Sequence, residues 1–246
     1  MSNTSPDPLS SGIRLNKYLA SAGVGSRRAC DQLVQQGEVT INGQPCLSPA
    51  YRVQVGDQIK ASGKRIEPLM LQSIVMHKPA GLVCTRKDEN HRATIYDLLP
   101  GRFQHLAHVG RLDKDSEGLL ILSNDGELTQ ALTHPSHSVK KIYHVTTENA
   151  FENAILTELE KGVFTEVGKC RAVSVKRISS RRMEMVLNTG LKRQIRYMLQ
   201  AVGHRVKRLV RVRIGELNLD NLKPGKWRLL EKHEREALLA QSSKSI

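Results

Sequence analysis

Aromatic residues are scarce in this chain of 246 residues, which has three Phe, five Tyr and one Trp. This excludes a long aromatic platform for single-stranded nucleic acid, because base stacking has to rely on one or two rings. The four cysteines, Cys30, Cys46, Cys84 and Cys170, form no Cys-x-x-Cys pair, which argues against a structural zinc site or a disulfide framework. The histidines show no metal-ligand spacing, and a G-x-x-x-x-G-K-[ST] phosphate loop is absent. We therefore expect no metal.

Long apolar runs are also missing. No stretch approaches the roughly 18 apolar residues of a membrane-spanning helix. The first residues, MSNTSPDPLSSG, are polar and rich in Pro and Ser, unlike the basic and then apolar pattern of an export signal. We therefore expect a cytoplasmic protein with no membrane partner.

Acidic residues are few relative to basic ones. The chain has 24 Asp and Glu against 38 Lys and Arg, which gives a net charge of +14 and a pI near 9.9. Clustered cations bind phosphates with release of counterions, so the balance favours nucleic acid as partner. A membrane surface and plain solvated faces are the alternatives. The length and the 39% hydrophobic content predict one or two domains.

Composition divides the chain into five segments. Residues 1–12 are too poor in apolar side chains to order, so we expect a disordered lead. Residues 13–63 predict a small module of two helices followed by short hairpins, with Ser26 as a helix N-cap and an Asn42-Gly43 turn. Residues 64–72, with several charges and Pro68, predict a linker. A larger domain is expected at residues 73–236 and a C-terminal tail at 237–246.

The larger domain shows many strand patterns and few helical ones. This predicts an α+β fold on a mainly antiparallel or mixed sheet with flanking helices. One helix is expected from Thr189, as its cap, to Gly203. In the strand pattern that follows, valines and isoleucine alternate with Arg211 and Arg213, so one face can be buried while the other presents cations. An edge strand protected by charge would have the same pattern.

Asp113 and Asp115 lie in the acidic, glycine-flanked stretch GRLDKDSEG. In an extended chain their Cα atoms would be about 7 Å apart, near the separation of the two carboxyl groups of an inverting glycosidase. Acidic residues next to glycines are also common turn formers, so the spacing alone leaves both interpretations open.

The stretch IRLNKYLASAGVGSRRACDQLVQQGEVTINGQ resembles the S4 RNA-binding domain over about Ile13 to Ile59. The pattern R-L-x-K-x-L, then S-R-R, then G-x-V-x-x-N-G carries the resemblance, which implies binding of structured RNA. Its cations lie beside the helix starts, where side chains and free backbone N–H groups can both face phosphate. Taken alone, they would fit a solvated charged face equally well.

Four motifs in the larger domain resemble those of the pseudouridine synthases, in the same order. They are HKPAGLVCT, VGRLDKDSEGLLILSNDGEL, KKIYHVT and LNTGLKRQIRYML. With the S4 module ahead of them, the match is specific to the branch that modifies ribosomal RNA, the RsuA/RluB/RluF family. It implies an enzyme that isomerises a uridine in RNA to pseudouridine, with a fold consisting of an S4-like module and a catalytic α+β domain.

The resemblance implies roles for individual residues. Asp113 would stabilise or bond to the anomeric carbon, Arg196 would pair with it, and Tyr143 would stack on uracil with its hydroxyl near C5. Arg111 would lie at the rim and support the flipped nucleotide. A satisfied core tyrosine and a solvated helix arginine are the alternatives for Tyr143 and Arg196. The residues expected to bind RNA are Arg14, Lys17, Arg27, Arg28, Arg111, Arg193, Arg211 and Arg213.

The isomerisation is redox-neutral and exchanges one bond to carbon for another, so no cofactor is expected. The resemblance implies ribosomal RNA as the partner, free or in an assembling subunit. The TRKDENHRATIYDLLP stretch and the RLVRVRIGELNLDNLKPGKW segment look more like the large-subunit type of this family, and this likeness favours large-subunit RNA. We expect a monomer. A ribosome-assembly protein with an S4 domain would explain the charge but not Asp113, Tyr143 and Arg196 together. A nucleoside hydrolase would use the carboxylate but would not need the S4 module.

Overall fold

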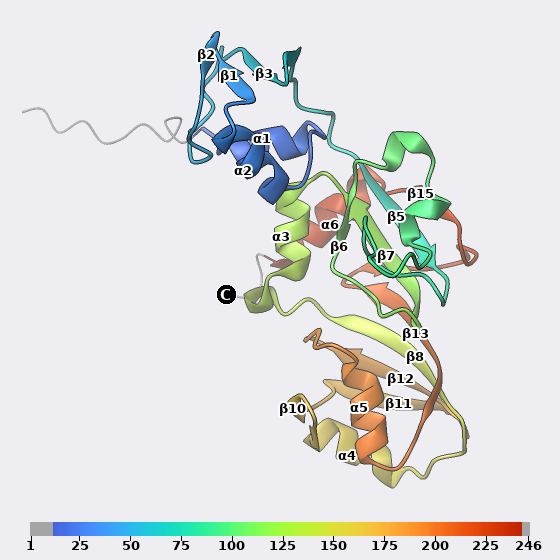
Figure 1. Cartoon of the computed structure of the whole chain (residues 1–246). Helices are drawn as coiled ribbons and strands as arrows, with labels where there is room; N and C mark the ends of the chain where they lie inside the picture. The colour runs from blue at the N-terminus through green and yellow to red at the C-terminus, as the bar shows by residue number, and fades with distance from the viewer. Residues whose placement is uncertain (1–11, 243–246) are drawn as a thin grey trace, which may run out of the picture. The chain divides into compact units, whose positions relative to one another are not determined.

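A computed structural model describes residues 12–242, which form two compact units divided between Leu71 and Gln72 (Figure 1). Apart from Gly12, the expected disordered lead lies outside the described residues, as do the last four residues of the expected tail. The mixture of helices and mixed sheets confirms the predicted fold class.

The first unit consists of two helices and a small sheet. Helices α1 (Leu15–Ser21) and α2 (Arg27–Gln35) precede strands β1 (Val39–Ile41), β2 (Gln44–Pro45), β3 (Ile59–Ala61) and β4 (Lys64–Arg65), in sheet order β2-β1-β3-β4. The hydroxyl of Ser26 accepts a hydrogen bond from the Ala29 N–H, which confirms the predicted N-cap. Leu15, Leu19 and Val34 are fully buried between helices and sheet, so the unit has a core of its own.

The linker expected at residues 64–72 begins later than predicted. Lys64 and Arg65 pair with β3 as strand β4, and the Ile66 N–H donates to the Ile59 carbonyl. The side chains of both β4 residues are exposed, so apolar patterning carried no signal for this strand.

A nine-stranded sheet organises the second unit within the described residues. Its order is β11-β12-β8-β13-β7-β5-β15, with β6 paired to β7 and β14 paired to β13. The pair β13–β7 is parallel, and the other described pairs in this sheet are antiparallel. The strands span Ser73–Lys78 (β5), Ala107–Val109 (β6), Glu117–Ser123 (β7), Lys141–Thr147 (β8), Ser174–Ser179 (β11), Arg182–Leu187 (β12), Val206–Ile214 (β13), Leu217–Asn218 (β14) and Trp227–Leu229 (β15).

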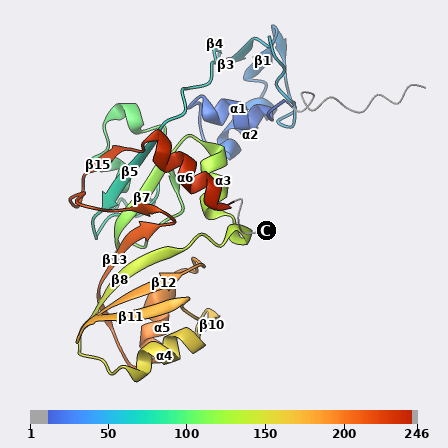
Figure 2. The same ribbon diagram turned by 180° about the vertical axis from the view of Figure 1, so that it is seen from behind.

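Helices cover the two halves of this sheet separately. Helices α4 (Ala154–Lys161) and α5 (Gln194–Ala201) lie beside β11 and β12, whereas α3 (Gly126–Thr133) and α6 (Lys232–Ser242) pack against each other beside β7 (Figure 2). The two resulting cores lie on opposite faces of β13, because Leu209 belongs to one and Val210 to the other. A third cluster gathers around the short 3₁₀ helices Ile95–Leu98 and Gly101–Phe103. A two-stranded sheet, β9 (Val163–Thr165) and β10 (Gly168–Cys170), completes the unit.

Two expectations for the second unit need correction. The helix expected from Thr189 begins at Gln194, because Arg193 adopts a left-handed backbone with φ of 55°. The tail expected from residue 237 continues as α6 through Ser242, and its Leu238 is fully buried.

Candidate active site

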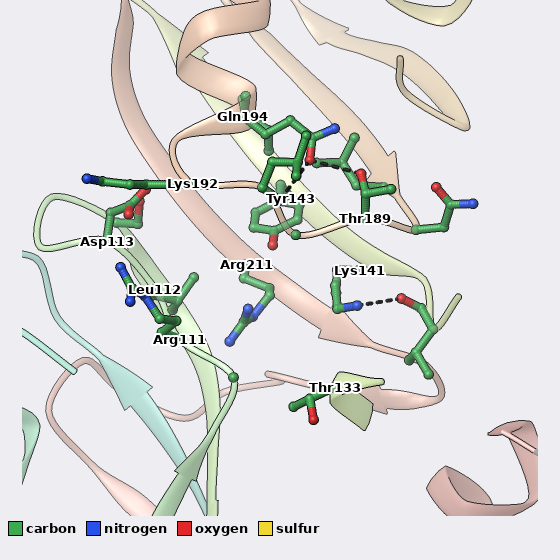
Figure 3. A pocket seen from close by; sticks show the side chains of 18 of the residues that line it. Arg111, Leu112, Asp113, Thr133, Lys141, Tyr143, Thr189, Lys192, Gln194 and Arg211 are labelled. Atoms are coloured by element: carbon green, nitrogen blue, oxygen red, sulfur yellow. Dashed lines mark hydrogen bonds between the residues drawn. The ribbon is translucent and has the colours of Figure 1, made fainter. Parts of the chain in front are cut away.

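A pocket of about 430 Å³ opens beside β8 and β13 in the second unit (Figure 3). This volume lies in the range of small-molecule sites. Its lining comes from the loop before β7, the segment between α3 and β8, strands β8 and β13, and the loop before α5, within residues 110–116, 132–139, 141–143, 187–195 and 209–211. Segments far apart in the chain therefore meet at one cavity.

Asp113 lines this pocket from the loop that precedes β7. The Ser116 N–H donates to the Asp113 carbonyl at 3.1 Å, which closes a tight turn. Lys78, fully buried at the end of β5, stabilises this turn through hydrogen bonds to its carbonyl groups. Its Nζ lies 3.1 Å from the carbonyl oxygen of Asp113, 3.2 Å from that of Lys114 and 2.8 Å from that of Ser116.

Lys78 also lies 3.1 Å from the carbonyl oxygen of Pro79, so three N–H groups serve four main-chain acceptors. Burial lowers the pKa of Lys78, and the nearby Cys84, Asp115, Asp113 and Glu117 oppose this shift. The lysine of the HKPAG motif is thus the internal support of the aspartate loop. No role had been predicted for it, although a lysine closing the apolar run SIVMHK is an available signal.

Gly118 connects the aspartate loop to β13. It lies opposite Arg211 in the parallel β7–β13 pair, and a Cβ added there would be 2.3 Å from the Arg211 carbonyl oxygen. The close approach of the two strands, together with a φ of 110°, explains the need for glycine. Arg211 in turn lies opposite Tyr143 on β8. Gly118, Arg211 and Tyr143 therefore form one row across three strands.

Tyr143 is 8% exposed, and its ring and hydroxyl point into the pocket (Figure 3). Lys141, two residues earlier on the same face of β8, also lines the pocket and donates to the Val139 carbonyl at 2.9 Å. Burial, followed by the charge of Arg211, lowers the pKa of Lys141 to about 8. Lys141 and Arg211 therefore make this part of the pocket positively charged, whereas Asp113 lines the pocket from the loop before β7.

Arg211 and Arg213 were expected on a solvent-facing side of their strand, and for Arg211 this expectation is wrong. Arg211 is 4% exposed and its Nε donates to the Leu119 carbonyl, because the loops before β7 and α5 cover this face of the sheet. Arg213 is partly buried, and it pairs with Glu216 and donates to the Gly215 carbonyl. A register shift between the two residues separates their environments.

Arg196 lies on α5 behind the aspartate loop. Its guanidinium donates to the Asp115 carbonyl at 2.9 Å, and Asp113 is close enough to influence its pKa. Burial and the neighbouring Arg193 lower the pKa of Arg196, whereas Asp115 and Asp113 oppose that shift. Within residues 12–242, however, no ion pair joins Arg196 to Asp113. Arg196, which was expected to pair with the Asp113 carboxylate, instead binds the main chain of the loop that carries Asp113.

The two aspartates of the loop occupy different environments. Asp113 lines the pocket, whereas Asp115 is exposed, with its carboxylate 3.9 Å from the guanidinium of Arg193. The arrangement does not present two carboxylates to one cavity, as a glycosidase pair would require.

The other expected RNA-binding residues lie in two places. Arg111 and Arg193 line the pocket, and Arg111 is exposed there. In the first unit Arg14, Lys17, Arg27 and Arg28 are all exposed. Among the described residues none of these four has an acidic partner within 4.0 Å, so their charge is available to an external polyanion.

In the described part of the chain, no cluster of three His, Cys, Asp or Glu side chains could hold a metal ion, and all four cysteines are free. None of the described helices has the length and apolar character to cross a membrane.

Family models match both units. Residues 72–201 match the model described as RNA pseudouridylate synthase, and residues 13–59 match the S4 domain. A pseudouridylate synthase of known structure superposes with a TM-score of 0.68 at 27% identity, covering 92% of this chain and all of that one. The structural match therefore includes both units.

Relatives match over nearly the whole chain. The ribosomal large subunit pseudouridine synthase B of Bacillus subtilis is 33% identical, with 92% of this chain and 96% of the relative covered. The dual-specificity RNA pseudouridine synthase RluF of Escherichia coli is 34% identical over 91% of this chain and 77% of its own. The pocket around the G-R-L-D loop, the S4 unit and these matches lead to one conclusion: the chain belongs to the RNA pseudouridylate synthase family and is an RNA pseudouridine synthase.

Proposed function

We propose that this protein converts a specific uridine of ribosomal RNA to pseudouridine, with large-subunit RNA as the preferred substrate. The observation that carries the proposal is the pocket in which the Asp113 loop meets the row formed by Arg211 and Tyr143. The name of the Bacillus subtilis relative refers to the large ribosomal subunit, whereas that of the Escherichia coli relative refers to dual specificity. The large-subunit preference rests on the first of these and on the sequence pattern.

Asp113 is the proposed catalytic carboxylate. Breaking the N-glycosidic bond builds positive charge at the anomeric carbon, and a carboxylate can stabilise that charge or bond to the carbon. Hydrogen bonds from Lys78 to its carbonyl groups fix the loop, and so does the pairing of Gly118 with β13. The carboxylate is therefore oriented before the RNA binds. We assign Tyr143 to stacking against uracil, with its hydroxyl near C5.

Arg196 is a positioning residue in this proposal. It is partly buried, donates to the Asp115 carbonyl and thereby fixes the loop that carries Asp113. Arg111 at the rim supports the nucleotide that has been flipped out of the RNA fold, because a carboxylate in a pocket cannot reach a stacked nucleotide. Arg193 and Arg213 are proposed to bind the RNA backbone.

The first unit holds the RNA in this proposal. Its exposed cations Arg14, Lys17, Arg27 and Arg28 supply affinity without reading the sequence of the target. Uridine and pseudouridine contain the same atoms, so the reaction balances without a cofactor. We assign the reaction to a monomer in the cytoplasm, acting on free RNA or on an assembling subunit.

The test replaces Asp113 by Asn and compares it with a matched change two residues away. Asp113→Asn keeps the shape but removes the charge, so single-turnover pseudouridine formation on unmodified rRNA transcripts should fall at least about 10³-fold. RNA affinity should stay the same or rise slightly, because a negative charge facing phosphates is lost. Asp115→Asn should lose little activity, since its carboxylate is exposed. Normal turnover by Asp113→Asn would refute the mechanism.

The substrate is identified by mapping pseudouridines in both ribosomal RNAs from cells with and without the gene. A site missing from large-subunit RNA supports the proposal, and a site missing from small-subunit RNA corrects it. Free uracil released from transcripts, without pseudouridine, would indicate a hydrolase.

A further inference from the structure

Arg211 is a lining residue of the pocket to which the proposed function assigns no chemical role. The residue is only 4% exposed, and yet its side chain lines the cavity. Its Nε is fixed on the Leu119 carbonyl at 2.8 Å, and its Nη2 is buried without a hydrogen-bond partner in the described structure. Figure 3 shows the guanidinium directed into the space between Arg111 and Lys141. A fixed cation with an unused donor is a preformed site for an electron-rich ligand group.

The surroundings of Arg211 support this interpretation. Lys141 adds a second cation to the same part of the pocket, and within residues 12–242 neither group has a carboxylate at ion-pair distance. Tyr143 lies directly opposite Arg211 on the neighbouring strand, and both side chains line the same pocket. A planar ring that stacks on Tyr143 would therefore bring its oxygen acceptors into the part of the pocket that Arg211 lines.

We infer that Arg211 binds a carbonyl oxygen of the flipped uracil and stabilises the negative charge that the base acquires when it leaves the sugar. The inference rests on the proposed function and adds a residue to it. A phosphate is the other possible oxygen ligand, but the RNA chain continues on both sides of each phosphate and must stay near the surface. The base is the part of the nucleotide that can reach a side chain as deeply buried as Arg211.

The chemistry of the reaction requires such a group. When the N1–C1′ bond breaks, its electron pair stays with the base, and the charge spreads over the uracil carbonyl oxygens. The C5–C1′ bond then forms, C5 loses its proton and N1 gains one, so atoms and electrons balance. Donors fixed in a water-poor pocket stabilise a developing charge strongly, and removal of one such donor typically lowers a rate about 10²–10³-fold.

The experiment measures rate and affinity on the full chain with unmodified rRNA transcripts. Arg211→Met should bind RNA within about twofold of wild type, with an unchanged salt slope, and should react about 10²–10³-fold more slowly. If Arg211 served a phosphate instead, affinity would fall and the salt slope would drop by about 0.7, which would overturn the inference. Arg177→Met is the matched control. That arginine also donates to a main-chain carbonyl but lies outside the pocket, so its rate should not change.

Transcripts made with 5-fluorouridine separate charge stabilisation from a structural role. Fluorine withdraws electrons and makes the detached base less dependent on external donors. The deficit of the Arg211 variant, followed as loss of 5-fluorouridine from digests, should therefore be smaller than its deficit on uridine. An equal deficit on both substrates would overturn the inference.

Arg211→Lys covers the case in which the methionine variant does not fold. It keeps the charge but lacks the planar set of donors, so its rate should be at least about 10-fold below wild type, with a smaller deficit on 5-fluorouridine. A lysine variant with the wild-type rate would overturn the inference. If wild-type protein makes no pseudouridine, the proposed function itself fails, whereas an active wild type with an equally active Arg211→Met refutes the role of Arg211 alone.

Discussion

Lys78→Met tests whether the buried lysine supports the aspartate loop. Its Nζ lies between 2.8 and 3.2 Å from four carbonyl oxygens and has three N–H groups to donate, and a hydrogen bond to a charged group is worth about 1.5–3 kcal/mol. Three such bonds amount to about 4.5–9 kcal/mol, and several kcal/mol of this offset the burial of the ammonium group. Methionine fills the space but cannot donate hydrogen bonds to the carbonyl groups, so the free energy of unfolding should fall by about 2–4 kcal/mol.

Urea unfolding measures this loss, and a thermal scan should show Tm lowered by about 5–12 °C for a domain of this size. At a temperature where both proteins are folded, the variant should lose more in single-turnover rate than in RNA affinity, because Asp113 loses its anchor while the surface cations remain. Lys176→Met, at an exposed position of β11, is the control and should change neither quantity. A Lys78→Met protein within about 0.5 kcal/mol of wild type and fully active would refute the reasoning.

Two further predictions concern charge. Folded Lys141 releases its proton near pH 8 and the unfolded chain keeps it to about 10.5, so the unfolded state binds more protons between these values. The free energy of unfolding of wild type relative to Lys141→Met should therefore rise from about pH 8 to 10.5 in urea titrations, and a flat difference would contradict the shift. Deleting residues 1–71 should leave a folded protein whose RNA affinity is lower and whose salt slope is smaller by up to about 3, because Arg14, Lys17, Arg27 and Arg28 are gone. An unchanged slope in filter binding would exclude this role of the first unit.

The elements with regular apolar periodicity were predictable from the sequence. Strand β13 was expected from its alternating valines and isoleucine, and α2 from its Ser26 cap. Helix α3 was missed because its first residues, Asp125 and Gly126, are typical turn formers, although Asp125 acts as the N-cap. The second half of helix α6, from residue 237, was assigned to a tail because only a few side chains of the helix, Leu238 among them, are buried in a charged sequence.

The site was predictable where a motif names the residue, and not where tertiary structure decides its environment. The G-R-L-D motif placed Asp113 in the candidate site, and the pocket lies there. Alternation along β13 correctly separated Arg211 from Val210, but it could not show that loops cover the face that carries Arg211 while helices α3 and α6 cover the face that carries Val210. Likewise, the motif around Arg196 could not indicate that its guanidinium would bind the Asp115 carbonyl, because that contact joins residues far apart in the chain.

The close approach at Gly118 has a consequence for how such an enzyme can change its target. Two residue pairs, Val210 with Glu117 and Arg211 with Gly118, join β7 to β13. Any side chain larger than hydrogen at position 118 would push β13 away and displace Arg211 and Tyr143 together relative to Asp113. Arg211 and Tyr143 thus move together, and a change at position 118 cannot adjust one of them without the other. A new RNA target has to be acquired through the rim of the pocket or the first unit, which separates the choice of uridine from the chemistry performed on it.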